Sequence, residues 1–155
     1  MNKRGFSLVE ILVVMVIMAV IASVGIPQIR DAIQKTSIRS ARVGFSLLAV
    51  KARQAAVSRG CRGVLHITGG TSGTVWVTAC KLTATGNVGT AVDTLGAVEQ
   101  LAARYGVSIS TTVDSIQYDP RGLSIGYTQA IVRITASGTS YMDSTVVNAI
   151  GKVTH

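Results

Sequence analysis

A single carboxylate, that of Glu10, lies inside an apolar run that extends from Phe6 to Ile26. A run of this length can cross a bilayer as a helix, which takes about 20 residues. A charged carboxylate near the bilayer core costs about 2.5–3.5 kcal/mol, so it requires a partner or a purpose. Lys3 and Arg4 precede the run. This positive charge favours a cytoplasmic N-terminus, with everything after the helix on the other side of the membrane.

The other residues that could do chemistry are few. Cys61 and Cys80 are the only cysteines, and His66 and His155 are the only histidines. The histidines are far apart in the sequence and form no metal-ligand cluster. No glycine-rich phosphate loop or nucleophile elbow is present in the sequence. We therefore expect neither a metal nor another cofactor, and we do not expect an enzyme.

One cysteine precedes a predicted β-hairpin and the other lies in its second strand. Residues 63–68 and 74–81 resemble short strands, and the Gly-Gly-Thr-Ser-Gly segment at 69–73 between them is typical of a turn. Folding the hairpin about its centre places Cys61 opposite Cys80. Opposed residues have Cβ atoms about 4.5–5.5 Å apart, which is close enough for a disulfide after slight adjustment. Two free buried thiols are the alternative, and an oxidising compartment favours the disulfide.

A second helical pattern follows the apolar run and continues to about Arg59, where Gly60 should end it. Pro27 lacks an N–H donor and should kink or loosen the helix near the end of the apolar run. Apolar residues recur in steps of three and four, which predicts one buried stripe: Ile38, Ala41, Phe45, Leu48, Ala52 and Ala55. Basic residues fall on a different side of the helix: Lys35, Arg39, Arg42 and Arg53.

The rest of the chain, residues 60–155, is predicted to be one β-rich head. Besides the hairpin, strands are expected at residues 107–112, 115–118, 131–135 and 145–150. The Thr-, Gly- and Ala-rich segment at 83–96 is expected to be an exposed loop. Asp119-Pro120-Arg121-Gly122 is typical of a turn, with proline favoured as its second residue.

The N-terminal segment Gly5-Phe6-Ser7-Leu8-Val9-Glu10 resembles the processing motif of type IV prepilins and type II secretion pseudopilins. A secretory signal is a poorer interpretation, because the charged residues run straight into the apolar run and no A-x-A-type cleavage site follows. A plain membrane anchor leaves Glu10 unexplained. The resemblance implies that prepilin peptidase cleaves between Gly5 and Phe6 on the cytoplasmic face, and that the new Phe6 amine is methylated.

This resemblance implies a division of the chain and a fold. Residues 1–5 would be the cleaved leader, 6–26 a transmembrane segment, 27–59 an amphipathic shaft and 60–155 the head. The implied fold is the pilin-like α+β arrangement, a long N-terminal helix packed on an antiparallel β-rich head. Pilins carry a proline comparable to Pro27. The glutamate equivalent to Glu10 is thought to pair with the Phe6 amine of a neighbouring subunit during assembly; the alternative is that Glu10 merely snorkels toward the headgroups.

The C-terminal half resembles the GspH/FimT group, which contains minor pilins and minor pseudopilins. The matching stretches are Ile-Gln-Tyr-Asp-Pro-Arg-Gly-Leu at 116–123, Val-Arg-Ile-Thr at 132–135 and Val-Asn-Ala-Ile-Gly-Lys-Val at 147–153. The resemblance implies a structural filament subunit that helps to initiate or cap a type IV pilus or a type II secretion filament. Its partners would be other pilins or pseudopilins, prepilin peptidase and, before assembly, inner-membrane lipid. A major pilin is a less favoured alternative.

Some FimT-type minor pilins act in DNA uptake through a C-terminal Gly-Arg-x-Arg motif. The matching stretch here, Gly-Lys-Val-Thr at 151–154, keeps one basic residue and lacks the second. The head carries six Lys and Arg residues against five acids, whereas the shaft from Arg30 to Arg59 carries seven against one. DNA binding is therefore the alternative function and not the favoured one. The residues that would carry it are Arg121, Arg133 and Lys152.

Overall fold

The computed structural model describes residues 7–83, 86, 88–126, 129–136, 141–148 and 150–154 of the 155-residue chain. The chain divides into two compact units, Met1–Gln34 and Lys35–His155, and each is described by itself. Helix α1, Leu8–Arg59, makes up nearly all of the described part of the first unit and contributes the first element of the second.

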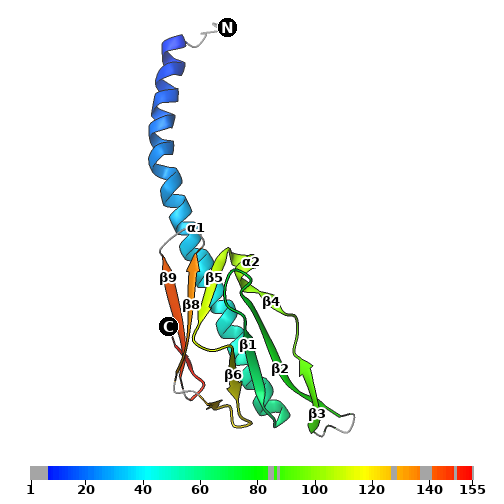
Figure 1. Ribbon diagram of the computed structural model, residues 1–155. Coiled ribbons are helices and arrows are strands. Elements are labelled where there is room, and N and C mark those ends of the chain that lie inside the picture. Colours follow the sequence, from blue (N-terminus) through cyan, green and yellow to red (C-terminus); the bar gives the residue numbers. More distant parts are fainter. Residues whose placement is uncertain are drawn as a thin grey trace. The chain divides into compact units, whose positions relative to one another are not determined.

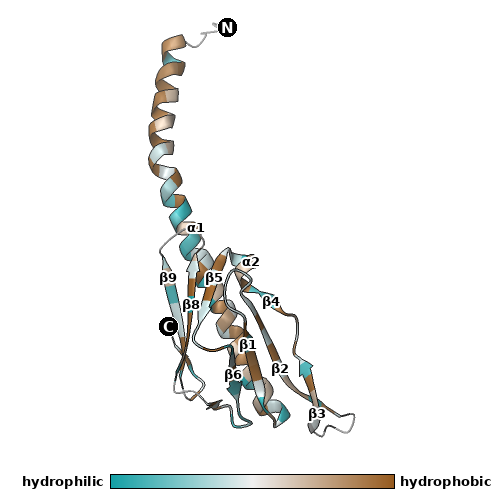
Figure 2. Ribbon diagram, in the orientation of Figure 1, coloured by the Kyte–Doolittle hydropathy of each residue, from teal (hydrophilic) through white to brown (hydrophobic). Residues whose placement is uncertain are grey.

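In the first unit, α1 is apolar on most of its turns (Figure 2). This part of the helix is long and apolar enough to cross a membrane, and none of its most apolar stretch is buried within the structure. Pro27 lies inside α1, which is helical on both sides of it. The kink expected there stays a prediction.

In the second unit, α1 ends where the sequence predicts. Gly60 follows the last helical residue, Arg59, with a φ of +64°, which a residue with a side chain rarely adopts. The Cys61 N–H donates to the Ala56 carbonyl, and the Gly60 N–H donates to the Val57 carbonyl. These two bonds are the Schellman pattern, which satisfies carbonyls at the helix end and turns the chain sharply into the first strand.

Two antiparallel sheets follow (Figure 1). The six-stranded sheet has the order β3-β2-β1-β6-β7, with β4 also paired to β2, and the four-stranded sheet has the order β10-β9-β8-β5. The strands are β1 (Gly63–Ile67), β2 (Thr74–Leu82), β3 (Val88–Thr94), β4 (Glu99–Gln100), β5 (Val107–Thr111), β6 (Ser115–Tyr118), β7 (Ser124–Ile125), β8 (Gln129–Ala136), β9 (Met142–Asn148) and β10 (Val153–Thr154). A short helix, α2 (Leu101–Tyr105), lies between β4 and β5.

The main core of the second unit is one cluster in which α1 contacts both sheets. The helix contributes mostly small residues to it, together with Phe45 and Ile38, and this lets the sheets approach the helix backbone closely. The predicted stripe is confirmed, although Leu48 is only partly buried and Ala49 is fully buried instead. Every buried hydrophobic residue among those described lies between Ile38 and Val147, so the unit Lys35–His155 contains its whole core.

The observed fold class is the predicted one, and three expectations about its elements need correction. The segment 83–96 was expected to be a loop, but it contains β3, which pairs with β2. β4, α2, β7 and β10 were not predicted. Arg42 was expected on the exposed basic side of the helix, but it is partly buried and its Nη1 donates to Asp143 of β9 at 2.7 Å.

Candidate functional site

The first candidate site is the exposed N-terminal part of α1. Glu10 lies in the first turn of the helix, and the backbone N–H of Glu10 donates to the Ser7 carbonyl. Large hydrophobic side chains surround it, from Leu8 at 81% exposed to Leu12 at 57%. An apolar surface of this extent requires a lipid or protein environment. Gly5 and Phe6, the predicted cleavage and methylation sites, lie outside the described residues.

The second feature is the corner between α1 and the six-stranded sheet. The disulfide predicted between Cys61 and Cys80 is present, with Cα atoms 6.3 Å apart. The register behind that prediction was off by one residue, because Gly63 pairs with Ala79. Cys61 is not in β1, and the turn after the helix brings its sulfur to β2. Arg59 adds to the same corner by donating to the Cys80 carbonyl at 2.6 Å.

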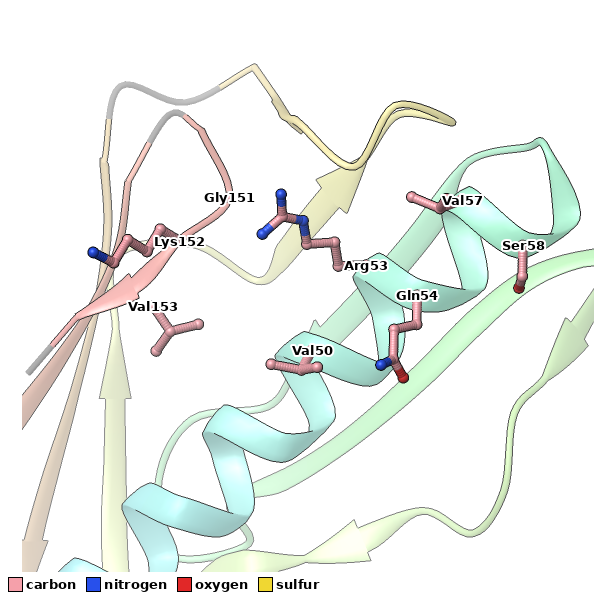
Figure 3. A pocket seen from close by; sticks show the side chains of 8 residues that line it. All are labelled: Val50, Arg53, Gln54, Val57, Ser58, Gly151, Lys152 and Val153. Atoms are coloured by element: carbon pink, nitrogen blue, oxygen red, sulfur yellow. The ribbon is translucent and has the colours of Figure 1, made fainter.

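The third feature is a groove between α1 and the C-terminal segment, which we call the α1–C-terminal groove (Figure 3). It encloses about 630 Å³. Its lining residues are Val50, Arg53, Gln54, Val57, Ser58, Gly151, Lys152 and Val153. Figure 3 shows the Arg53 side chain extending from the helix toward the Gly151–Val153 segment, and Val153 pointing back toward the helix.

A turn held by Asn148 positions the C-terminal wall of this groove. The Asn148 side-chain oxygen accepts a hydrogen bond from the Lys152 backbone N–H at 2.8 Å, and the Lys152 carbonyl accepts one from the Asn148 N–H at 3.1 Å. Gly151 has a φ of +74°, and a Cβ there would lie 2.9 Å from the Tyr118 ring. A side chain is therefore excluded at Gly151 by both conformation and space.

Tyr118 lies directly behind Gly151 and is fully buried. Its hydroxyl has no hydrogen-bond partner within the described part of the chain. Burial raises the pKa of Tyr118 to about 12, and the nearby positive charge of Arg53 opposes part of that rise. The hydroxyl is thus a neutral, buried polar group on a ring that lies against Gly151 of the groove.

The structure separates the three residues predicted to carry DNA binding. Lys152 lines the α1–C-terminal groove. Arg121 is highly exposed, and its Nε donates to Asp119 at 2.9 Å. Arg133 lies on β8, between Ser110 of β5 and Ser144 of β9, and does not line the groove.

Asp119 organises the turn that contains Arg121. Its carboxylate accepts hydrogen bonds from the backbone N–H groups of Leu123 and Arg121, and from the Arg121 side chain. These bonds, chiefly the one from Leu123, hold the pKa of Asp119 below its usual value. The Arg121 charge is therefore partly neutralised within the turn.

The cation that the sequence analysis did not connect with the groove is Arg53. It was assigned to the basic side of the shaft, whereas in the structure its side chain extends into the groove that Lys152 of the head also lines. The Asp-Pro-Arg-Gly turn was recognised in the sequence, but only the structure shows what it packs against. A Cβ at Gly122 would lie 3.0 Å from the Arg53 side chain, so this turn rests against Arg53.

A smaller hollow of about 350 Å³ lies on the six-stranded sheet, lined by residues that include Arg62, His66 and Val92. The His66 ring stacks on Trp76 with centroids 4.9 Å apart, and its Nε2 lies 2.9 Å from the Thr78 hydroxyl. Burial lowers the pKa of His66 from 6.5. Within the described ranges, no group of three or more His, Cys, Asp and Glu residues is arranged to hold a metal ion.

Comparison with known proteins adds two observations. Residues 1–26 match the prokaryotic N-terminal methylation motif. The fold is similar to that of the type IV minor pilin FimU of Pseudomonas aeruginosa strain PAO1. One crystal form of FimU (space group P21) aligns with a TM-score of 0.59 and 13% identity, over 77% of this chain and 88% of FimU.

A second crystal form of FimU (space group P65) aligns with a TM-score of 0.50 and 12% identity, over 75% of this chain and 90% of FimU. No curated protein matches this chain in sequence. The chain thus combines the N-terminal motif of type IV pilins with the pilin fold of FimU, a long helix packed on an antiparallel β-rich head.

Proposed function

We propose that this chain is a structural filament subunit of the GspH/FimT type, a minor pilin or a minor pseudopilin. It is anchored in the inner membrane with a cytoplasmic N-terminus, and it enters a type IV pilus or a type II secretion filament through its N-terminal helix. There it helps to initiate or cap the filament. The observation that carries the proposal is the exposed apolar helix with Glu10 in its first turn, on a chain with the pilin fold.

Processing follows from the N-terminal motif. Prepilin peptidase removes residues 1–5, and the new amine of Phe6 is methylated. In the membrane, the Glu10 carboxylate then lacks water, and an amine from a neighbouring subunit compensates its charge. This pairing favours docking and sets the axial register of the subunit.

Two substitutions test the proposal in the full-length chain. Gly5→Val should leave the precursor uncleaved, as seen by its mass in membranes, whereas Gly25→Ala should be processed normally because a Cβ there contacts nothing within 4 Å. A mature-sized product from the Gly5 variant would refute the processing assignment.

Glu10→Gln should be processed but should fall by at least about tenfold in sheared filaments, because the amide removes only the charge. Ser7→Ala, in the same turn of the helix, should assemble like the wild type. Normal incorporation of the Glu10 variant would end the docking argument.

DNA uptake is the second candidate function, and one observation favours it. Arg53 and Lys152 line the same groove, and no described carboxylate pairs with either within 4 Å. The test is fluorescence anisotropy with double-stranded DNA and the Lys35–His155 fragment across a salt series. Affinity near physiological salt that falls with Lys152→Ala would support a DNA receptor. A fragment that starts at Gly60 is unsuitable, because it lacks the helix that fills the core.

A further inference from the structure

The α1–C-terminal groove presents uncompensated positive charge. Four ion pairs in the described part of the chain use Arg42, Arg59, Arg104 and Arg121, and none uses Arg53 or Lys152. The unit Lys35–His155 carries twelve Lys and Arg residues against five Asp and Glu residues, a net charge of +7. The occupant that such a groove fits is acidic, and a second copy of this unit would be repelled.

The groove is also apolar. Val50 and Val57 line it and are 46% and 53% exposed, and Val153 faces them from the other side. Val43 and Leu47 are also exposed, and steps of four, three and seven residues place them on the same side of α1 as Val50 and Val57. This apolar stripe on the helix runs into the groove.

The positive charge and the apolar lining of the groove together favour a protein over DNA as its occupant. DNA contacts proteins largely through phosphate and sugar, which require hydrogen-bond donors and gain little from valine side chains. A protein segment can bring a carboxylate and a neighbouring apolar side chain at once. The Tyr118 ring lies behind the Gly151 wall, and its buried hydroxyl, unpartnered among the described residues, interacts electrostatically with the Arg53 charge.

We propose that the α1–C-terminal groove docks an acidic segment of a different filament subunit. A carboxylate of that segment pairs with Arg53, Lys152 adds positive charge on the C-terminal wall, and an adjacent apolar side chain packs against Val50, Val57 and Val153. The inference rests on the proposed function, and it adds the face through which this subunit selects its neighbour. Because the contact is between unlike charges, it favours a heterologous neighbour over self-association.

The test uses the full-length chain in cells, with the photocrosslinking residue benzoylphenylalanine replacing Val57 in the groove. The control position is Val92, which is 71% exposed and lines the hollow on the six-stranded sheet. The expected result is a crosslink from position 57, absent from position 92, to a pilin-like subunit. The crosslinked peptide should contain an Asp or Glu next to an apolar residue.

Charge reversal provides the second arm. Arg53→Glu with Lys152→Glu should reduce the yield of this crosslink at least about tenfold, and Asp→Lys or Glu→Lys in the crosslinked partner peptide should restore it. Arg39→Glu with Lys81→Glu makes the same change in net charge at two exposed residues outside the groove and should leave the yield unchanged. If the double reversal prevents accumulation of the chain, Arg53→Gln with Lys152→Gln removes the charges and should also reduce the yield.

Several outcomes would overturn the inference. One is a crosslink from position 57 to a second copy of this chain or to DNA. Another is a crosslink yield at position 57 no higher than at position 92. A third is a loss of crosslink yield in the control double variant equal to that in the groove double variant. Absence of the wild-type chain from filaments would instead refute the proposed function. Wild-type incorporation without a groove crosslink would refute only the docking inference.

Discussion

Reduction of the Cys61–Cys80 disulfide should lower the free energy of unfolding of the Lys35–His155 unit by about 3 kcal/mol. The two cysteines are 19 residues apart, and the chain-entropy model assigns about 3 kcal/mol to a loop of this size, because the closed loop restricts the unfolded chain. Cys61 contacts Ala55 and Ala79 in a small cluster apart from the main core, so reduction leaves the main core in place.

The assay is urea unfolding of the Lys35–His155 fragment, oxidised and reduced, followed by circular dichroism. With a slope of about 1–3 kcal/mol per molar urea, the midpoint should fall by about 1–3 M on reduction. The slope should rise, because the reduced unfolded chain exposes more surface. Cys61→Ala with Cys80→Ala is the control for packing, since reduced wild type keeps both sulfur atoms and the variant loses them.

The comparison isolates the contribution of the crosslink from that of the side chains. If the oxidised and reduced proteins differ by less than about 1 kcal/mol, restriction of the unfolded chain does not explain the role of this bond. If the alanine variant is much less stable than the reduced wild type, the sulfur atoms contribute mainly through packing.

Three further perturbations test the packing and electrostatics of the head. Gly63→Ala should destabilise the Lys35–His155 fragment by about 1–3 kcal/mol in thermal unfolding, because the new Cβ would collide with the Ala52 carbonyl of α1. Gly69→Ala should reduce the stability less, because the atom nearest to its new Cβ is 3.3 Å away. Tyr118→Phe should leave stability unchanged or raise it by about 1 kcal/mol, since the buried hydroxyl has no partner among the described residues, and a loss of 1 kcal/mol or more would show that it makes a bond. The pKa of His66 is lowered in the folded state, so the unfolded chain takes up a proton first as the pH falls. The free energy of unfolding should therefore decrease as the pH falls from about 7.5 to 5.5. His66→Asn should flatten that pH dependence, and equal slopes for the variant and the wild type would contradict the assignment.

The helix and its buried face could be predicted because their signals are local. The three- and four-residue spacing of apolar residues defines the helix and its buried face, and the glycine after Arg59 defines its end. The hairpin was predicted for the same reason, since residues 69–73 are typical of a turn between two β-branched runs. β5 and β6 also lie within one residue of their predicted bounds.

The strand β3 was missed because its signal is weak and lies within a Thr-, Gly- and Ala-rich segment. Val and Thr alternate at 88, 90, 92 and 94, but Gly89 and Ala91 lie between them, and pairing with β2 decides the conformation. β4, β7 and β10 are two residues long and α2 is five, which is too short for any periodicity to be detected.

The groove could not be predicted for a different reason. Arg53 and Lys152 are 99 residues apart, and only the packing of the C-terminal turn against α1 brings them to one site. The shaft and the head were predicted to carry their charges separately, and that separation does not hold at the groove. The one-residue error in the hairpin register has a similar origin, because the turn after the helix, outside the strands, determines where Cys61 lies.

The two sides of α1 within the Lys35–His155 unit should change at different rates over evolutionary time. On the buried side, Ala41, Ala49, Ala52 and Ala56 are at most 1% exposed, so a larger side chain there would push the helix away from the sheets. On the other side, Val43 and Leu47 pack against nothing in the core cluster and can be exchanged at little cost to folding. Related chains can therefore keep one scaffold while the outer side of the helix drifts to suit new neighbours.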